Sequence, residues 1–70
     1  MTRLEAAAAA YRAAVIAAHN AATRSRLTRR DRDATGREIA RANQASLDAR
    51  RALEHARDQL VAAALEHTGV

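Results

Sequence analysis

The chain has no cysteine, no proline and no lysine, and its one aromatic residue is Tyr11. Without cysteine, neither a disulfide framework nor a thiolate metal site can form, and the redox compartment is left open. Without proline, no residue breaks a helix from within. Because no aromatic side chain stands among the arginines, stacking on single-stranded bases is not expected. These absences favour an uninterrupted helical protein.

Alanine dominates what remains, with 21 of the 70 positions. It is the strongest helix former, so the backbone preference is helical before any packing is considered. It is also the smallest apolar side chain, so each alanine buries little surface. In a chain of this size a single core rarely supplies more than ~3–5 kcal/mol. We therefore expect one small domain, residues 1–70, that packs against copies of itself or against a larger protein.

Two stretches have the spacing of a helix with one packed face, and both are heptad seams of the coiled-coil kind. The first predicts a helix over about 3–32, with its seam at Leu4, Ala8, Tyr11, Val15, Ala18, Ala22 and Ser25. The second predicts a helix over about 36–67, with its seam at Ile39, Ala42, Ser46, Ala49, Leu53, Ala56, Leu60 and Ala63. We interpret these residues as a helix-packing interface.

A turn is predicted over about 33–36, in the sequence Asp-Ala-Thr-Gly. Thr35 followed by Glu38 is a capping box, which marks the start of a second helix near Gly36. Asp31 and Asp33 are unfavourable at a helix C-terminus, so the first helix is expected to stop a little before the turn. The fold class is therefore an all-α antiparallel two-helix hairpin that assembles into a helical bundle. The alternative is one continuous helix that pairs with a second chain, and Gly36 argues against it.

Folding the chain about the bond between residues 35 and 36 predicts which residues face each other. The predicted pairs are Tyr11 with Leu60, Val15 with Ala56, Ala18 with Leu53, and Ala22 with Ala49. Further apolar residues lie off the seams and widen the apolar stripe: Ala6–Ala10, Ile16, Leu47, Val61 and Leu65. A helix that is apolar over much of its circumference needs more than one neighbour, which again predicts an oligomer or a larger partner.

Charge is concentrated in residues 23–41, which hold seven arginines against three acidic residues and so carry the whole net charge of +4. In a hairpin these arginines form a basic tip that suits phosphates or an acidic protein surface: Arg24, Arg26, Arg29, Arg30, Arg32, Arg37 and Arg41. The ordinary alternative is a solvated helix end, with local pairs of Arg29 with Asp33 and of Asp33 with Arg37. A GC-rich genome would also favour arginine over lysine.

Sites for chemistry are not predicted. The three histidines, His19, His55 and His67, are far apart and form no metal-binding pair, and there is no phosphate loop or nucleophile motif. We expect no enzyme activity, no cofactor, no metal and no small-molecule substrate. The apolar run from residue 4 to 22 is interrupted by Glu5 and Arg12, so neither a signal peptide nor a membrane span is expected. The expected location is the cytoplasm, or a particle assembled there.

These observations favour a non-enzymatic structural, assembly or adaptor protein that acts through helix packing. A component of a multi-subunit particle, such as a phage virion, is one setting for it. Two alternatives rest on the basic tip. One is a nucleic-acid-associated protein that contacts phosphates through residues 23–41, and the other is a small inhibitor that docks on an acidic protein surface.

Overall fold

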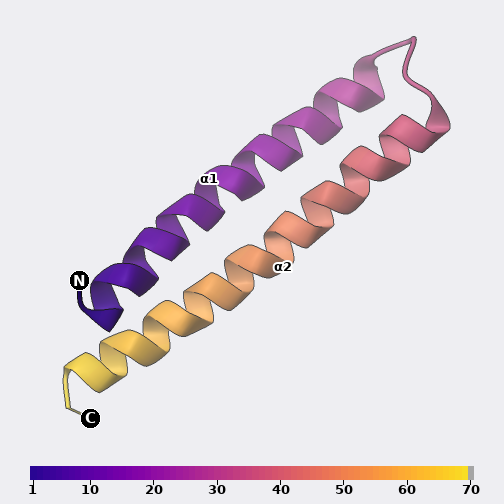
Figure 1. Cartoon of the computed structure of the whole chain (residues 1–70). Coiled ribbons are helices and arrows are strands. Elements are labelled where there is room, and N and C mark those ends of the chain that lie inside the picture. Colours follow the sequence, from indigo (N-terminus) through magenta and orange to yellow (C-terminus); the bar gives the residue numbers. More distant parts are fainter. Residues whose placement is uncertain (70) are drawn as a thin grey trace.

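The computed structural model describes residues 1–69, and Val70 lies outside them. Helix α1 spans Arg3–Arg30 and helix α2 spans Gly36–His67. The two helices run antiparallel and side by side, with both termini at one end and the connecting loop at the other (Figure 1). The predicted antiparallel hairpin is confirmed, and a continuous helix through Gly36 is ruled out.

The hairpin is a thin rod that measures 54 × 15 × 13 Å. Its radius of gyration is 15.9 Å, whereas a compact domain of the same length has a radius of about 11 Å. Its accessible surface is 5471 Å², whereas a compact monomer of this mass exposes about 4,200 Å². The two helices alone therefore leave an unusually large share of the chain in contact with solvent.

Both helices begin with the same capping arrangement. Thr35 is the N-cap of α2, and its Oγ1 accepts a hydrogen bond from the backbone N–H of Glu38 at 3.1 Å. Thr2 is the N-cap of α1, and its Oγ1 accepts from the N–H of Glu5, also at 3.1 Å. The sequence shows the Thr-x-x-Glu signal at both places, although the sequence analysis used it only for the second helix.

Helix α1 ends at Arg30, two residues before the expected end, because Asp31 starts the turn. The N–H of Asp31 still donates to the carbonyl of Leu27 at 3.1 Å, but its carboxylate accepts the N–H of Asp33 at 2.9 Å. A side chain that bonds its own backbone two residues on competes with helix formation. The loop consequently covers residues 31–35, and Gly36 is already the first residue of α2.

Two contacts between side chains show how the helices are aligned. The predicted folding point would place Ser25 opposite Ser46, but Ser25 bonds Asn43 at 2.5 Å, three residues nearer the turn. At the other end of the rod, Arg3 bonds Glu66 at 2.7 Å. These two contacts lie three and two residues nearer the turn on α2 than the predicted folding point places them, which is less than one helical turn. The hairpin is confirmed, and the individual pairs, such as Tyr11 with Leu60, stay predictions.

The interior of the hairpin consists of small side chains. Three residues of the described chain are buried: Ser25, Ala42 and Ala63, with exposed fractions of 4%, 9% and 3%. Within residues 1–69, no large side chain is fully buried. The larger seam residues, such as Leu53 and Leu60, are half-buried. The helices therefore lie along a seam of small contacts and do not enclose a filled core.

Candidate functional site

The structure places the predicted packing residues of α2 along its inner face. Ala42 and Ala63 are buried, and the other predicted seam residues of this helix are half-buried: Ile39, Ser46, Ala49, Leu53, Ala56 and Leu60. They recur at alternating intervals of three and four residues, which keeps one stripe of a helix facing a neighbour. The α2 half of the candidate interface thus forms one continuous line towards α1.

The predicted packing residues of α1 are half-buried with one exception: Leu4, Ala8, Tyr11, Ala18 and Ala22 are half-buried, whereas Val15 is 40% exposed. Ala14, next to Val15, is half-buried instead. Ala7 and Ala21 are also half-buried, so the inner face of α1 includes residues one position before several predicted ones. Val15 consequently stands at the flank of the seam.

One polar contact lies inside the seam, near the turn. The hydroxyl of Ser25 is buried and donates to the amide Oδ1 of Asn43 at 2.5 Å. A buried hydroxyl without a partner would cost free energy, so this bond favours the observed alignment of the helices over a shifted one. The sequence analysis placed Ser25 in the seam but overlooked Asn43, whose role becomes visible only when the pairing of the helices is known.

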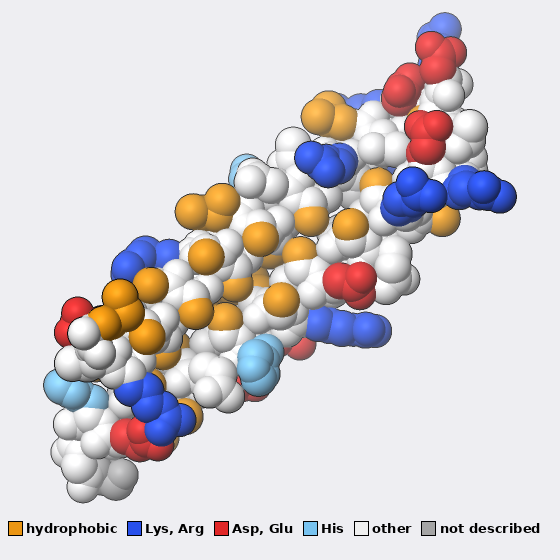
Figure 2. All heavy atoms as spheres, viewed as in Figure 1, with side chains coloured by type: hydrophobic (Ala, Val, Ile, Leu, Met, Phe, Trp, Pro, Cys, Tyr) orange, Lys and Arg blue, Asp and Glu red, His pale blue; other side chains and the backbone are white. Residues whose placement is uncertain are grey.

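Large aliphatic side chains remain on the outer surfaces of both helices. Ile16 and Leu27 of α1, with Leu47, Val61 and Leu65 of α2, are between 46% and 62% exposed. In Figure 2 apolar side chains follow the rod between the two helices, and charged side chains lie along its flanks and at its ends. Single exposed apolar residues are ordinary, but five of them beside an alanine-rich band are a candidate interaction surface.

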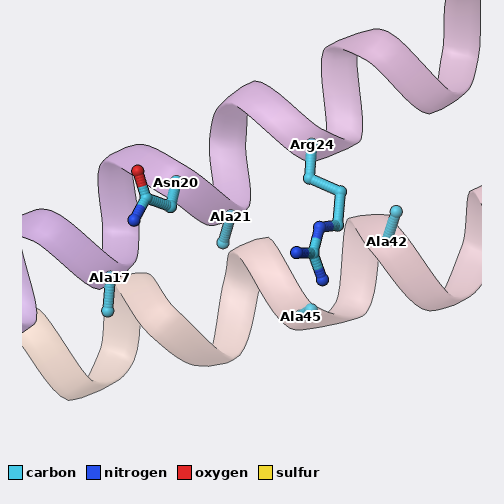
Figure 3. A pocket seen from close by; sticks show the side chains of 6 residues that line it. All are labelled: Ala17, Asn20, Ala21, Arg24, Ala42 and Ala45. Carbon is cyan, nitrogen blue, oxygen red and sulfur yellow. The ribbon is translucent and has the colours of Figure 1, made fainter.

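A shallow hollow lies between the helices on one side of the rod. It is lined by Ala17, Asn20, Ala21 and Arg24 of α1 and by Ala42 and Ala45 of α2 (Figure 3). The Arg24 side chain extends from α1 towards α2 along the edge of the hollow. Because its floor is made of alanine methyl groups, the hollow offers apolar contact and few polar groups to orient a small ligand.

The arginines of the basic tip are all exposed: Arg24, Arg26, Arg29, Arg30, Arg32, Arg37 and Arg41. The predicted pairs of Asp33 with Arg29 and Arg37 do not form, because Asp33 lies in the loop and is not on the helical path. Across residues 1–69, the ion pair within 4 Å is that of Arg3 with Glu66, at the other end. The tip therefore presents arginines that no carboxylate of the described chain neutralises.

Among the residues that the structure describes, no three of the histidine, aspartate and glutamate side chains come together as a metal site. Neither α1 nor α2 contains a stretch long and apolar enough to cross a membrane.

Comparisons of the chain with models of protein families, with curated proteins and with solved structures found no match.

Proposed function

We propose that this chain is a non-enzymatic assembly or adaptor module, which acts by packing its helices against further copies of itself or against a larger protein. The observation that carries the proposal is the thin interior of the hairpin. Within residues 1–69 the buried residues are a serine and two alanines, while six larger aliphatic side chains, from valine, isoleucine and leucine, are exposed. Hydrophobic burial is the main favourable term in folding, and two helices of this composition supply little of it between themselves.

The surface area supports the same proposal. The chain exposes 5471 Å², which exceeds the area of a compact monomer of its mass by over a thousand Å². A standard protein interface removes about 800 Å² from each partner. One interface of ordinary size would therefore bring this chain close to the exposure of a compact protein. A multi-subunit particle assembled in the cytoplasm, such as a phage virion, is a setting in which a small module of this kind works.

The test measures mass and helicity on the same sample. Size-exclusion chromatography with light scattering gives the mass, and circular dichroism gives the helix content and the thermal transition. We expect either an oligomer with cooperative melting or a monomer that is incompletely helical and gains helix with its partner. A monomer that is fully helical and melts cooperatively would contradict the proposal, because such a chain would need no partner.

A second candidate function rests on a different observation: within residues 1–69, the arginines at the tip have no carboxylate within 4 Å. Such a tip suits contact with phosphates of DNA or RNA, and oligomerisation would multiply the contacts. Replacing Arg29, Arg30 and Arg32 together with glutamine should abolish binding and leave helicity intact. The binding should also weaken steeply with salt. No retardation of nucleic acid by the native chain at low salt would end this candidate.

A further inference from the structure

Two rows of residues, each repeating every seven positions, lie along one side of the rod. The α1 row is Arg3, Ala10, Ala17 and Arg24, and the α2 row is Glu38, Ala45, Ala52, Gln59 and Glu66. Seven residues are two helical turns, so the members of each row share one face of their helix. All nine residues are exposed. We call the surface formed by both rows the two-row face.

Three hollows show that the rows border the same side of the hairpin. Ala17 and Ala45 line the hollow in Figure 3, near the middle of the rod. Arg24 and Glu38 line a second hollow towards the turn. Arg3 and Glu66 line a third near the termini. The two-row face therefore has an apolar centre and a charged residue of each row at either end.

The charges at the two ends have the same order. At the termini α1 supplies Arg3 and α2 supplies Glu66, and these two side chains bond at 2.7 Å. At the turn α1 supplies Arg24 and α2 supplies Glu38, and Arg41 of α2 lines the same hollow beside Glu38. Within the two rows, both charges of α1 are positive and both charges of α2 are negative. These four row residues are complementary to the same four residues of a second copy.

We infer that the two-row face binds a second copy of this chain, which is rotated by 180° about the long axis of the rod. This inference rests on the proposed function and names its partner. The rotation places α1 of each copy across α2 of the other. Arg3 and Arg24 then lie opposite Glu66 and Glu38 of the second copy, and the alanines pack together at the centre. The product is a four-helix bundle with both basic tips at the same end.

The area of the face suits a stable dimer. A side of the rod that measures 54 by 15 Å projects about 800 Å², which matches the area that each partner contributes to a standard interface. Alanines at the centre allow the helix axes to approach closely, and the exposed Leu27 stands on α1 three residues after Arg24, about 60° round the helix from it. This side chain supplies larger apolar area at the border of the contact.

The reversed arrangement, with the tips at opposite ends, is disfavoured on this face. It would place α1 across α1 and so bring Arg3 near Arg24, and Glu66 near Glu38, of the second copy. It would separate the basic tips, but the rods are already 13 to 15 Å thick, which exceeds the screening length of ~8 Å at physiological ionic strength. Repulsion between neighbouring tips is therefore weaker than repulsion between like charges in contact, and the arrangement with the tips together is favoured.

The first experiment compares two substitutions on the same helix by sedimentation equilibrium. Ala45→Glu places a carboxylate in the centre of the two-row face and should weaken the dimer by at least about tenfold, because a buried unpaired charge is costly. Ala40→Glu is the matched control, since this exposed alanine faces about 140° away from Ala45. It should leave the dimer within about twofold of the native chain. Equal effects of the two substitutions would overturn the inference.

The second experiment decides the orientation by the sign of its effect. Arg24→Glu should weaken the dimer about five- to tenfold, because it sets two glutamates against each other at two symmetric places. Glu38→Arg should weaken it similarly, and the double variant should restore it. In the reversed arrangement Arg24 faces another arginine, so Arg24→Glu alone would strengthen the dimer. That result would overturn the inference.

The third experiment measures the distance between the tips directly. A spin label attached through Asp33→Cys is unique in the chain, because the sequence contains no cysteine. The label-to-label distance in the dimer should be set by the 13 to 15 Å thickness of the rods. A distance near the 54 Å length of the rod would show the reversed arrangement and overturn the inference.

The outcomes separate this inference from the proposed function. An oligomer that forms equally well with Ala45→Glu overturns the two-row face but leaves the assembly function in place. A monomer that is incompletely helical at every concentration also overturns the self-association and leaves packing against another protein. A fully folded monomer overturns both.

Discussion

The two halves of the rod differ in how they hold together. The half near the termini contains the larger half-buried seam residues Leu4, Tyr11, Leu53 and Leu60. The half near the turn contains one comparable residue, Ile39, and otherwise small or polar seam residues: Ala18, Ala21, Ser25, Thr28, Ala42, Ser46 and Ala49. The turn half also contains residues 23–41, whose charge of +4 equals the net charge of the chain. Apolar packing thus dominates at one end, and hydrogen bonding and charge dominate at the other.

This difference between the halves is related to their distance from the loop that joins the helices. A short loop keeps the helices close near the turn whatever the side chains are, so that half can hold a polar seam and a basic surface. The helices are farthest from the loop at the termini, where larger apolar side chains and the bond of Arg3 with Glu66 take over. We therefore expect substitutions in the two halves to change the free energy of unfolding by different amounts.

The largest effect is expected from removing a large side chain in the terminal half. Leu60→Ala should lower the free energy of unfolding by about 2 kcal/mol, near the low end for such changes because Leu60 is half-buried. The matched change in the turn half, Ser46→Ala, should alter it by less than about 0.5 kcal/mol. Urea denaturation at one fixed protein concentration measures both. Equal losses would remove the contrast between the halves.

The polar contact in the turn half should show a strong asymmetry between its two partners. Asn43→Ala leaves the buried Ser25 hydroxyl without its acceptor and should cost about 1–2 kcal/mol. Ser25→Ala leaves only the exposed Asn43, which water can satisfy, so it should cost less than about 0.5 kcal/mol. Chemical denaturation of the two variants is the measurement. A larger loss for Ser25→Ala would mean that the hydrogen bond does not determine the alignment.

The glycines at the two ends of α2 should respond in opposite directions. Gly36 has helical geometry, and a Cβ there would meet no atom within 4 Å, so Gly36→Ala should raise the free energy of unfolding by about 0.4–1 kcal/mol. Gly69 has a φ of 75°, so Gly69→Ala should lower it. Thermal melting followed by circular dichroism distinguishes the two. Stabilisation by Gly69→Ala would contradict this description of the helix end.

The smallest effect is expected at the ion pair of the terminal half. Arg3 and Glu66 are exposed, so Arg3→Ala should cost only about 0.2–1 kcal/mol at low salt. The loss should shrink at high salt, because surface charges are screened. Melting curves of the variant and the native chain at two salt concentrations measure this. A loss that persists at high salt would show that the arginine stem, and not its charge, supports the packing.

The hairpin, the second helix and its cap were predictable because each rests on a local signal. The residues of α1 that face α2 could not be predicted exactly, because alanine occupies adjacent positions such as Ala7 and Ala8, or Ala21 and Ala22. Where neighbours are identical, periodicity cannot tell which one lies innermost. The prediction placed Val15 in the seam, and the structure leaves it 40% exposed.

The end of α1 depended on one further local competition. The carboxylate of Asp31 bonds the N–H of Asp33, and α1 ends at Arg30, two residues before the predicted end. The contacts of Ser25 with Asn43 and of Arg3 with Glu66 join residues far apart in sequence, so they become predictable only after this pairing is known. The arginine-rich tip needed no such knowledge, since its residues are neighbours along the chain.

The most direct test of the central claim, that this hairpin is too thinly packed to be stable alone, is the melting temperature of the purified chain over an about hundredfold range of concentration. If the folded state is an oligomer, mass action makes the melting temperature rise with concentration. If another protein is the partner, the isolated chain is incompletely helical throughout. A sharp transition from a fully helical monomer, at the same temperature at every concentration, would contradict the account.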